Sequence, residues 1–239
     1  MKQFKIYRDE TKTIYADDIP EFPNSEYWGN LSNKVLFMFY RLEYSNRLLD
    51  SIFSKINLYN FNLKKRNREN NNETTIIPHI EIIHIMSDLR MILDEMIALL
   101  YILEQREIIG DYPQVIQIDS IGAFLELSRN ANSESVQFFI DYKEYLKLIN
   151  DISNTYKHSF LNDHVIFYRQ LQEPTVFAIK TATVDRKKNK FDLETNKLIA
   201  VPLEKIIDNF NEMFEKYLMT LKDNAHQQIV KDFENKRRS

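Results

Sequence analysis

Residues 82–103 read IIHIMSDLRMILDEMIALLYIL, and this stretch decides the fold. Its apolar residues recur at alternating steps of four and three, which is an unbroken seven-residue repeat. That spacing places one apolar stripe along a helix and predicts that the helix packs against other helices. The stripe consists of Ile82, Met86, Leu89, Leu93, Met96, Leu100 and Leu103.

Three other segments show the same helical spacing. The first helix is expected to begin after Asn24 or Ser25, either of which can cap it, and to bury Leu31, Val35, Met38, Leu42, Leu49, Ile52 and Ile56. A third helix beginning at Asn132 or Ser133 is expected to bury Val136, Phe139, Ile149, Ile152, Tyr156 and Phe160. The last helix follows Pro202, which suits a first turn, and its stripe is Leu203, Ile206, Phe210, Met213, Tyr217 and Leu221.

The remaining segments lack a helical period. Residues 1–24 carry Pro20 and Pro23 and predict an extended arm, with a short strand near Phe4 and Ile6. Ser120 is expected to cap a short helix that reaches Leu127. β-Branched and aromatic residues predict strands before the last helix, at Val165–Arg169, Thr175–Val184, Phe191–Leu193 and Lys197–Val201.

Together these patterns predict a mainly α fold, an antiparallel four-helix bundle with a small antiparallel β insertion before the last helix. We expect a single domain over residues 25–222, with the insertion at 164–201. The arm at 1–24 precedes this domain, and the charged helix end and tail at 223–239 follow it.

Composition excludes several classes of protein. Only three glycines occur, which disfavours the glycine-rich phosphate loops of nucleotide-binding folds. The absence of cysteine excludes disulfides, thiol catalysis and zinc fingers. The net charge of −3 gives no global basic surface for nucleic acid, and the basic clusters at 64–68, 186–190 and 236–238 are typical of solvated loops and tails.

Targeting and membrane signals are also lacking in the sequence. The first residues, Met1 to Lys5, contain no apolar run of the kind that a secretory signal requires. The longest apolar run, Met96 to Leu103, is too short to span a bilayer. We therefore expect a cytoplasmic protein that does not contact the membrane.

One polar stripe on the third helix is the candidate site. Lys147, Asp151, Asn154 and His158 follow one another at steps of three and four, on the face opposite the apolar stripe. Every amphipathic helix has a solvated polar face, so the stripe is either ordinary surface or one wall of an active cleft. Asparagine is a poor helix former, and a histidine here gains nothing from the core, so the stripe is slightly unexpected for plain surface, although ordinary surface remains the commoner interpretation.

Residues 148–158, LINDISNTYKH, resemble the motif of the HEPN superfamily. That family motif has an Arg, usually followed by Asn or another polar residue, and a His four to six positions after the Arg. Asn154 matches the polar position and His158 the histidine, whereas Ser153 stands where the family has its Arg. The resemblance implies a helical bundle, often dimeric, of the bacterial toxin–antitoxin, abortive-infection and RNA-guided defence systems.

The active members of that family are metal-independent endoribonucleases, and the resemblance implies roles for four residues here. His158 would move the proton of the 2′-hydroxyl or the leaving group, because the pKa of histidine lies near neutrality, and Asn154 would orient it. Lys157 and Lys147 would contact RNA phosphates, although lysine lacks the two parallel donors of the missing Arg. The implied partners are a second copy, RNA, and a cognate antitoxin or defence protein, without cofactor or metal.

Two alternatives remain at this point. The missing Arg favours a catalytically silent module of the same fold that dimerises or binds a partner. A di-iron site is suggested by Glu81-x-x-His84 and, more loosely, by Asp223-x-x-His226, but these pairs lie at opposite ends of their stripes and are interpreted as surface polar groups. Three aromatic residues, Trp28, Tyr40 and Tyr44, are expected to be partly exposed.

Overall fold

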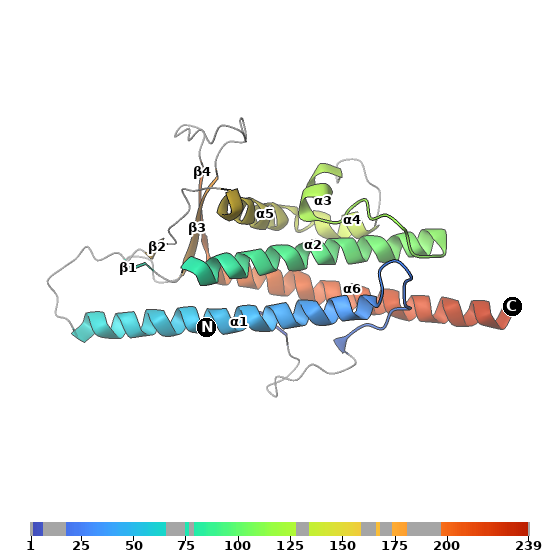
Figure 1. The fold of residues 1–239 in the computed structure, drawn as a ribbon, viewed down its shortest axis with the longest axis horizontal. Coiled ribbons are helices and arrows are strands. Elements are labelled where there is room, and N and C mark those ends of the chain that lie inside the picture. Colours follow the sequence, from blue (N-terminus) through green and yellow to red (C-terminus); the bar gives the residue numbers. More distant parts are fainter. Residues whose placement is uncertain are drawn as a thin grey trace.

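The chain is represented by a computed structural model, in which the described residues are 2–6, 18–65, 75–76, 79–127, 134–158, 166–167, 174–180 and 197–238. Three long helices run along the long axis of the molecule, as Figure 1 shows: α1 (Leu31–Lys65), α2 (His79–Ile109) and α6 (Leu203–Arg238). Three shorter helices lie on the side of α2 away from α1, namely α3 (Ile121–Leu127), α4 (Glu134–Ile140) and α5 (Lys143–His158).

The described strands form two antiparallel pairs. β3 (Thr175–Lys180) pairs with β4 (Lys197–Pro202), with Thr175 opposite Pro202 and Lys180 opposite Lys197. β1 (Thr75–Ile76) pairs with β2 (Ile166–Phe167), a contact that the sequence did not predict. The expected strand over Lys197–Val201 is confirmed, as is the expected start of a strand at Thr175. Residues 181–184 and the expected strand Phe191–Leu193 lie outside the described residues.

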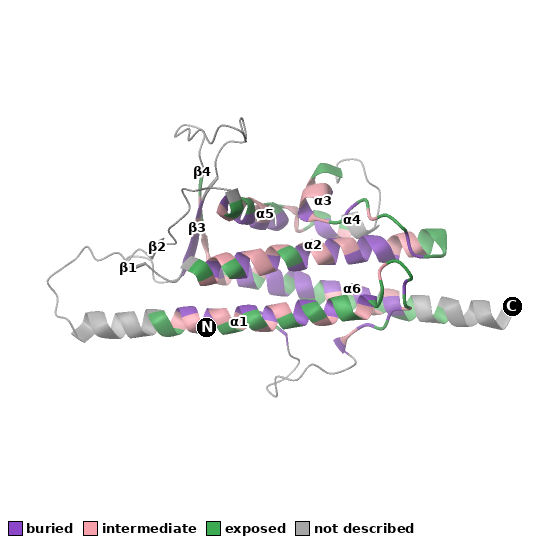
Figure 2. Cartoon of the chain, in the orientation of Figure 1, coloured by how far each residue is buried: buried purple, intermediate pink, exposed green. Residues whose placement is uncertain are grey.

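The apolar stripes form one core between the helices. All seven predicted residues of α2 and all six of α6 are buried, and so are the first six of the seven predicted residues of α1. Purple, buried residues accordingly follow the inner faces of the long helices in Figure 2. Aromatic rings pack between the helices. The rings of Phe39 in α1 and Phe214 in α6 meet edge-on with centroids 5.7 Å apart, and the ring centroids of Phe139 in α4 and Tyr217 in α6 are 6.5 Å apart. A helix with an apolar stripe of this spacing is stabilised mainly by the burial of the stripe's side chains.

The start of the first helix differs from the prediction. α1 begins at Leu31, and its cap is Asn30, whose side-chain oxygen accepts the Asn33 N–H at 3.3 Å. The predicted cap Ser25 instead closes a turn, with Oγ accepting from Trp28 N at 3.1 Å, and the turn ends at Gly29, whose φ of 68° suits glycine. By contrast, Ser120 caps α3 as predicted, since its Oγ accepts the Ala123 N–H at 3.3 Å.

The predicted third helix is divided into α4 and α5 by a turn at residues 141–142. There the Tyr142 N–H bonds to Phe139 O at 3.2 Å, a step of three residues instead of four. The structure thus confirms a mainly helical chain with a small antiparallel sheet before the last helix. The finer expectation of a four-helix bundle stays a prediction. Among the described residues, no helix is both long and apolar enough to cross a membrane.

Candidate functional site

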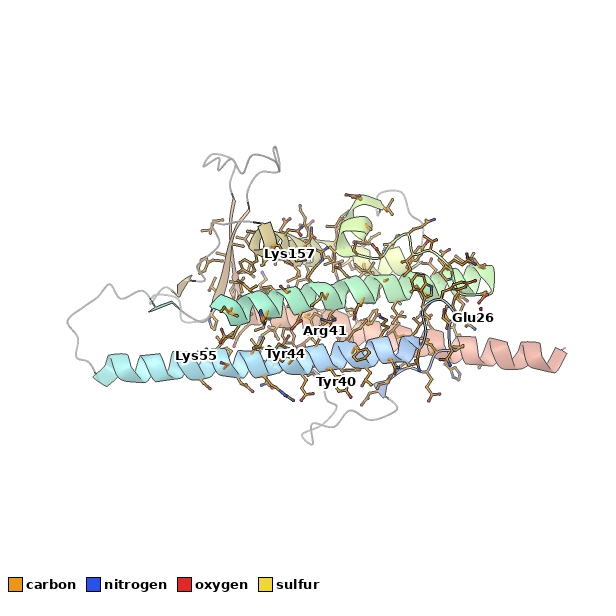
Figure 3. The ribbon with its side chains drawn as sticks, viewed as in Figure 1. Glu26, Tyr40, Arg41, Tyr44, Lys55 and Lys157 are labelled. Carbon is orange, nitrogen blue, oxygen red and sulfur yellow. The ribbon has the colours of Figure 1, made fainter. Side chains whose placement is uncertain are left out.

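The polar stripe on α5 faces outward, as the sequence predicts. Lys147, Asn154 and Lys157 are exposed, whereas Ile149 and Ile152 are fully buried. Figure 3 places Lys157 on α5, on the side of α2 away from α1. Within the stripe the Asn154 amide donates to the side-chain oxygen of Asn150 at 3.2 Å. The two asparagines are therefore linked one helical turn apart.

His158 is the last residue of α5, and its side chain lies outside the described residues. The pairing of Asn154 with His158 stays a prediction for that reason. Ser153, at the position where the HEPN motif has its Arg, is buried with 1% of its surface exposed, and its hydroxyl has no hydrogen-bond partner among the described residues. The position therefore faces the interior of the molecule, where a free guanidinium would be costly to bury.

A cation reaches the α5 stripe from a different helix. Arg90 of α2 donates from Nη1 to the side-chain oxygen of Asn150, which also accepts from Asn154. The same guanidinium donates from Nε to both carboxylate oxygens of Asp94, at 3.0 and 2.9 Å. Asn150 therefore links Arg90 to Asn154, because its side-chain oxygen accepts a hydrogen bond from each of them. The sequence patterns did not predict this residue, whose local signal is the i, i+4 spacing of Arg90 and Asp94.

Asp94 connects three parts of the fold. It pairs with Arg90 within α2, and its Oδ1 accepts the backbone N–H of Ile121 at 2.7 Å, at the first residue of α3. Burial raises the pKa of the Asp94 carboxyl, and this effect outweighs the lowering by the Ile121 N–H, by Arg90 and by the positive charge of Lys157. Lys157 therefore lies within electrostatic range of the Arg90–Asp94 pair.

A second candidate site is a groove between α1 and α2, with a volume of about 490 Å³. Its rim carries three aromatic residues of α1, Phe37, Tyr40 and Tyr44, which are 56%, 51% and 48% exposed. They are spaced i, i+3 and i+7, so they form one stripe along the helix. Figure 3 shows Tyr40, Arg41 and Tyr44 together on α1. The expected exposure of Tyr40 and Tyr44 is thus confirmed.

The polar lining of this groove contains both signs of charge. Arg41 lies 3.7 Å from Asp88 and 3.9 Å from Glu95, and both distances exceed a normal hydrogen bond. Lys34 also lines the groove. Met91 lies beside it, with its sulfur 3.4 Å from Nη1 of Arg41. Burial raises the pKa of both Asp88 and Glu95, and the nearby charge of Arg41 lowers it to a smaller extent.

The suggested metal ligands do not come together. Glu81 forms an ion pair with Lys55 of α1, and His84 is exposed on α2. Within the described ranges, no group of three or more His, Cys, Asp and Glu side chains is arranged to hold a metal ion. The interpretation of Glu81 and His84 as surface polar groups agrees with these positions.

Comparison of the chain with protein-family models, with curated proteins and with solved structures returned no match. The α5 stripe and the α1–α2 groove are therefore the two features of the chain that point to a function.

Proposed function

We propose that the chain is a dimerising helical module that associates with a second copy through the α1–α2 groove. The observation that carries this proposal is the stripe of half-exposed Phe37, Tyr40 and Tyr44 along the groove. Aromatic, methionine and arginine side chains are enriched in the cores of protein interfaces, and Arg41 and Met91 lie beside this stripe.

The charges of the groove support a second copy as the partner. Two cations, Lys34 and Arg41, and two carboxylates, Asp88 and Glu95, line the same surface. A surface that contacts its own copy around a two-fold axis must be complementary to itself, and a patch with both signs meets that requirement. Because Arg41 lies beyond hydrogen-bond distance of both carboxylates, its guanidinium keeps donors for groups of the second copy.

Sedimentation equilibrium of three proteins tests this proposal. The unmodified chain is expected to be dimeric at micromolar concentration, and Tyr40→Glu is expected to be monomeric because it places a charge at the centre of the aromatic stripe. Met219→Glu is the matched control, since Met219 is an apolar residue of α6 that is 59% exposed and does not line the groove. A monomeric unmodified chain, or a dimer in all three proteins, contradicts the proposal.

A second candidate function is metal-independent RNA cleavage at the α5 stripe, as the resemblance to HEPN proteins implies. Its specific support is Arg90, which brings a guanidinium next to Asn150 and Asn154 although the motif itself lacks the Arg. In this candidate His158 is the acid or base, Asn154 orients it, and Lys157 and Lys147 contact phosphates. The roles in bacterial defence or with an antitoxin belong to the same candidate.

Cleavage of total RNA in the presence of a chelator tests this second function. Active unmodified protein beside inactive His158→Ala and Asn154→Ala variants supports ribonuclease activity. If the unmodified protein leaves the RNA intact, or if His158→Ala cleaves equally well, the chain is not a HEPN-type nuclease. This outcome is separate from the dimer proposal, because the α1–α2 groove contains none of the proposed catalytic residues.

A further inference from the structure

Residues 2–6 lie in an extended conformation against α1 and α6, held by two asparagine side chains. On one side, Asn46 of α1 accepts the Phe4 N–H at 2.8 Å and donates to Phe4 O at 2.9 Å. On the other side, Asn211 of α6 accepts the Lys5 N–H at 2.8 Å and donates to Gln3 O at 3.0 Å. Four consecutive polar groups of the backbone are thus satisfied by side chains.

This pattern is the one that an extended peptide requires. In an extended chain the N–H and C=O of one residue point to one side, and the flanking C=O and N–H point to the other. In a sheet, neighbouring strands satisfy both sides. Here Asn46 and Asn211 replace those strands, because each primary amide offers one acceptor and two donors. The two asparagines contact backbone atoms alone in these four bonds, so they do not select the side chains of the bound segment.

Selection of side chains comes from residues 4–6, which alternate. Phe4 and Ile6 point inward and are 2% and 7% exposed, whereas Lys5 between them is exposed, as is Lys2 at the start of the segment. The Phe4 ring meets Phe210 of α6 edge-on at 5.4 Å, a favourable aromatic geometry. One aromatic residue and one apolar residue two positions later therefore anchor the segment.

Acidic residues flank the two asparagines. Asp208 pairs with Lys2, and Glu215 lies 3.6 Å from Lys5. On α1, Asp50 accepts from the Gln3 side-chain amide at 2.9 Å. Since Asp208, Asn211 and Glu215 are spaced i, i+3 and i+7, one face of α6 carries the amide between two carboxylates.

We propose that these residues of α1 and α6 form a peptide-binding site, and that residues 2–6 occupy it as an intramolecular ligand. We call it the arm site; it comprises Asn46, Asp50, Asp208, Phe210, Asn211 and Glu215. Its ligand is an extended protein segment that has an aromatic residue between lysines and an apolar residue two positions after the aromatic one. The proposal is independent of the α1–α2 groove and of the α5 stripe.

Binding of a labelled peptide to the full-length chain tests the arm site by fluorescence anisotropy. The peptide carries the sequence of residues 1–6, and the chain carries Phe4→Ala, which removes the anchor of its own arm. We expect saturable binding at least about tenfold tighter than to the unmodified chain, where the intact arm competes from a high effective concentration. Circular dichroism checks that the Phe4→Ala chain keeps the helical signal of the unmodified chain. Should Phe4→Ala lose its helical signal, Lys5→Pro replaces it, since proline removes the N–H that Asn211 accepts.

Three controls make the result specific. A peptide with alanine in place of its phenylalanine is expected not to bind. Asn211→Ala in the Phe4→Ala chain is expected to weaken peptide binding about tenfold through the loss of two hydrogen bonds. Asn224→Ala, further along α6, serves as its matched control and is expected to bind normally. Absence of saturable binding to a folded chain, equal binding of both peptides, or no effect of Asn211→Ala overturns the proposal.

Discussion

Arg90 and Asp94 form an ion pair within α2, in which the single Nε–H of Arg90 is shared between the two carboxylate oxygens of Asp94, at 3.0 and 2.9 Å. Only 13% of the Arg90 side chain and 27% of the Asp94 side chain are exposed. Because Arg90 also bonds to Asn150 of α5 and Asp94 to the first N–H of α3, the pair joins three helices. The pair is therefore a structural element, and its cation, Arg90, hydrogen-bonds to the Asn150 side chain that also accepts from Asn154.

Replacement of Arg90 by alanine is expected to lower the free energy of unfolding by about 1–3 kcal/mol, because it leaves a partly buried carboxylate without its partner. Urea denaturation followed by circular dichroism measures this change. Arg47→Ala is the control, since the Arg47 side chain is 72% exposed and pairs with Glu43 at the surface, where ion pairs contribute little. Equal losses for the two variants would show that the Arg90 pair has no special role.

In the monomeric Tyr40→Glu chain, where Glu95 has no partner from a second copy, Glu95→Gln is expected to stabilise the fold at neutral pH. Burial raises the pKa of Glu95 in the folded state, so the folded chain binds this proton more tightly than the unfolded chain does. The stability contributed by this group is complete below the ordinary pKa of a glutamate and is lost as the pH rises through the raised folded pKa. Glutamine avoids that loss.

Urea denaturation over a series of pH values measures the effect. At neutral pH the free energy of unfolding of the Glu95→Gln chain should exceed that of the chain that retains Glu95. This difference should shrink as the pH falls below the ordinary pKa of glutamate. If the chain that retains Glu95 is the more stable of the two at neutral pH, the attraction between Glu95 and Arg41 outweighs the cost of burying the carboxylate.

If the α5 stripe binds RNA, Lys157→Ala and Lys147→Ala should each weaken the binding of a labelled single-stranded RNA. Each should also reduce the slope of log affinity against log salt by about 0.7, the value expected for the loss of one phosphate contact. The control is Lys55→Ala on α1, whose lysine pairs with Glu81 and is distant from α5 in Figure 3. Identical salt slopes for the three variants and the unmodified chain would exclude a phosphate-binding role for the stripe.

The long helices could be predicted from sequence because burial follows a seven-residue period. Leu89, Leu93 and Met96 are fully buried, as their spacing requires. The break between α4 and α5 could not be predicted, because the apolar steps continue across it from Phe139 to Leu146 and Ile149. Neither glycine nor proline occurs at residues 141–142.

Contacts between segments that are distant in the sequence could not be predicted from local patterns. The outward direction of Asn154 follows from periodicity, but the approach of Arg90 depends on how α2 crosses α5. An extended arm over residues 1–24 was predicted from its lack of period and its prolines, but the short strand expected near Phe4 and Ile6 is not found in the described residues 2–6. Its partners, Asn46 and Asn211, were not predicted, because spacing within one helix does not show which segment lies against it.

In the proposed dimer, the mixed charges of the α1–α2 groove pair with those of a second copy, and an exchange of charge tests this pairing. One variant combines Lys34→Glu with Arg41→Glu, and the other combines Asp88→Lys with Glu95→Lys. Each groove then carries a single sign of charge, so each variant should repel its own copy and sediment as a monomer. An equimolar mixture of the two should sediment as a heterodimer. A mixture that stays monomeric although both variants are folded, or an unmodified chain that is monomeric throughout, would contradict pairing of the two grooves.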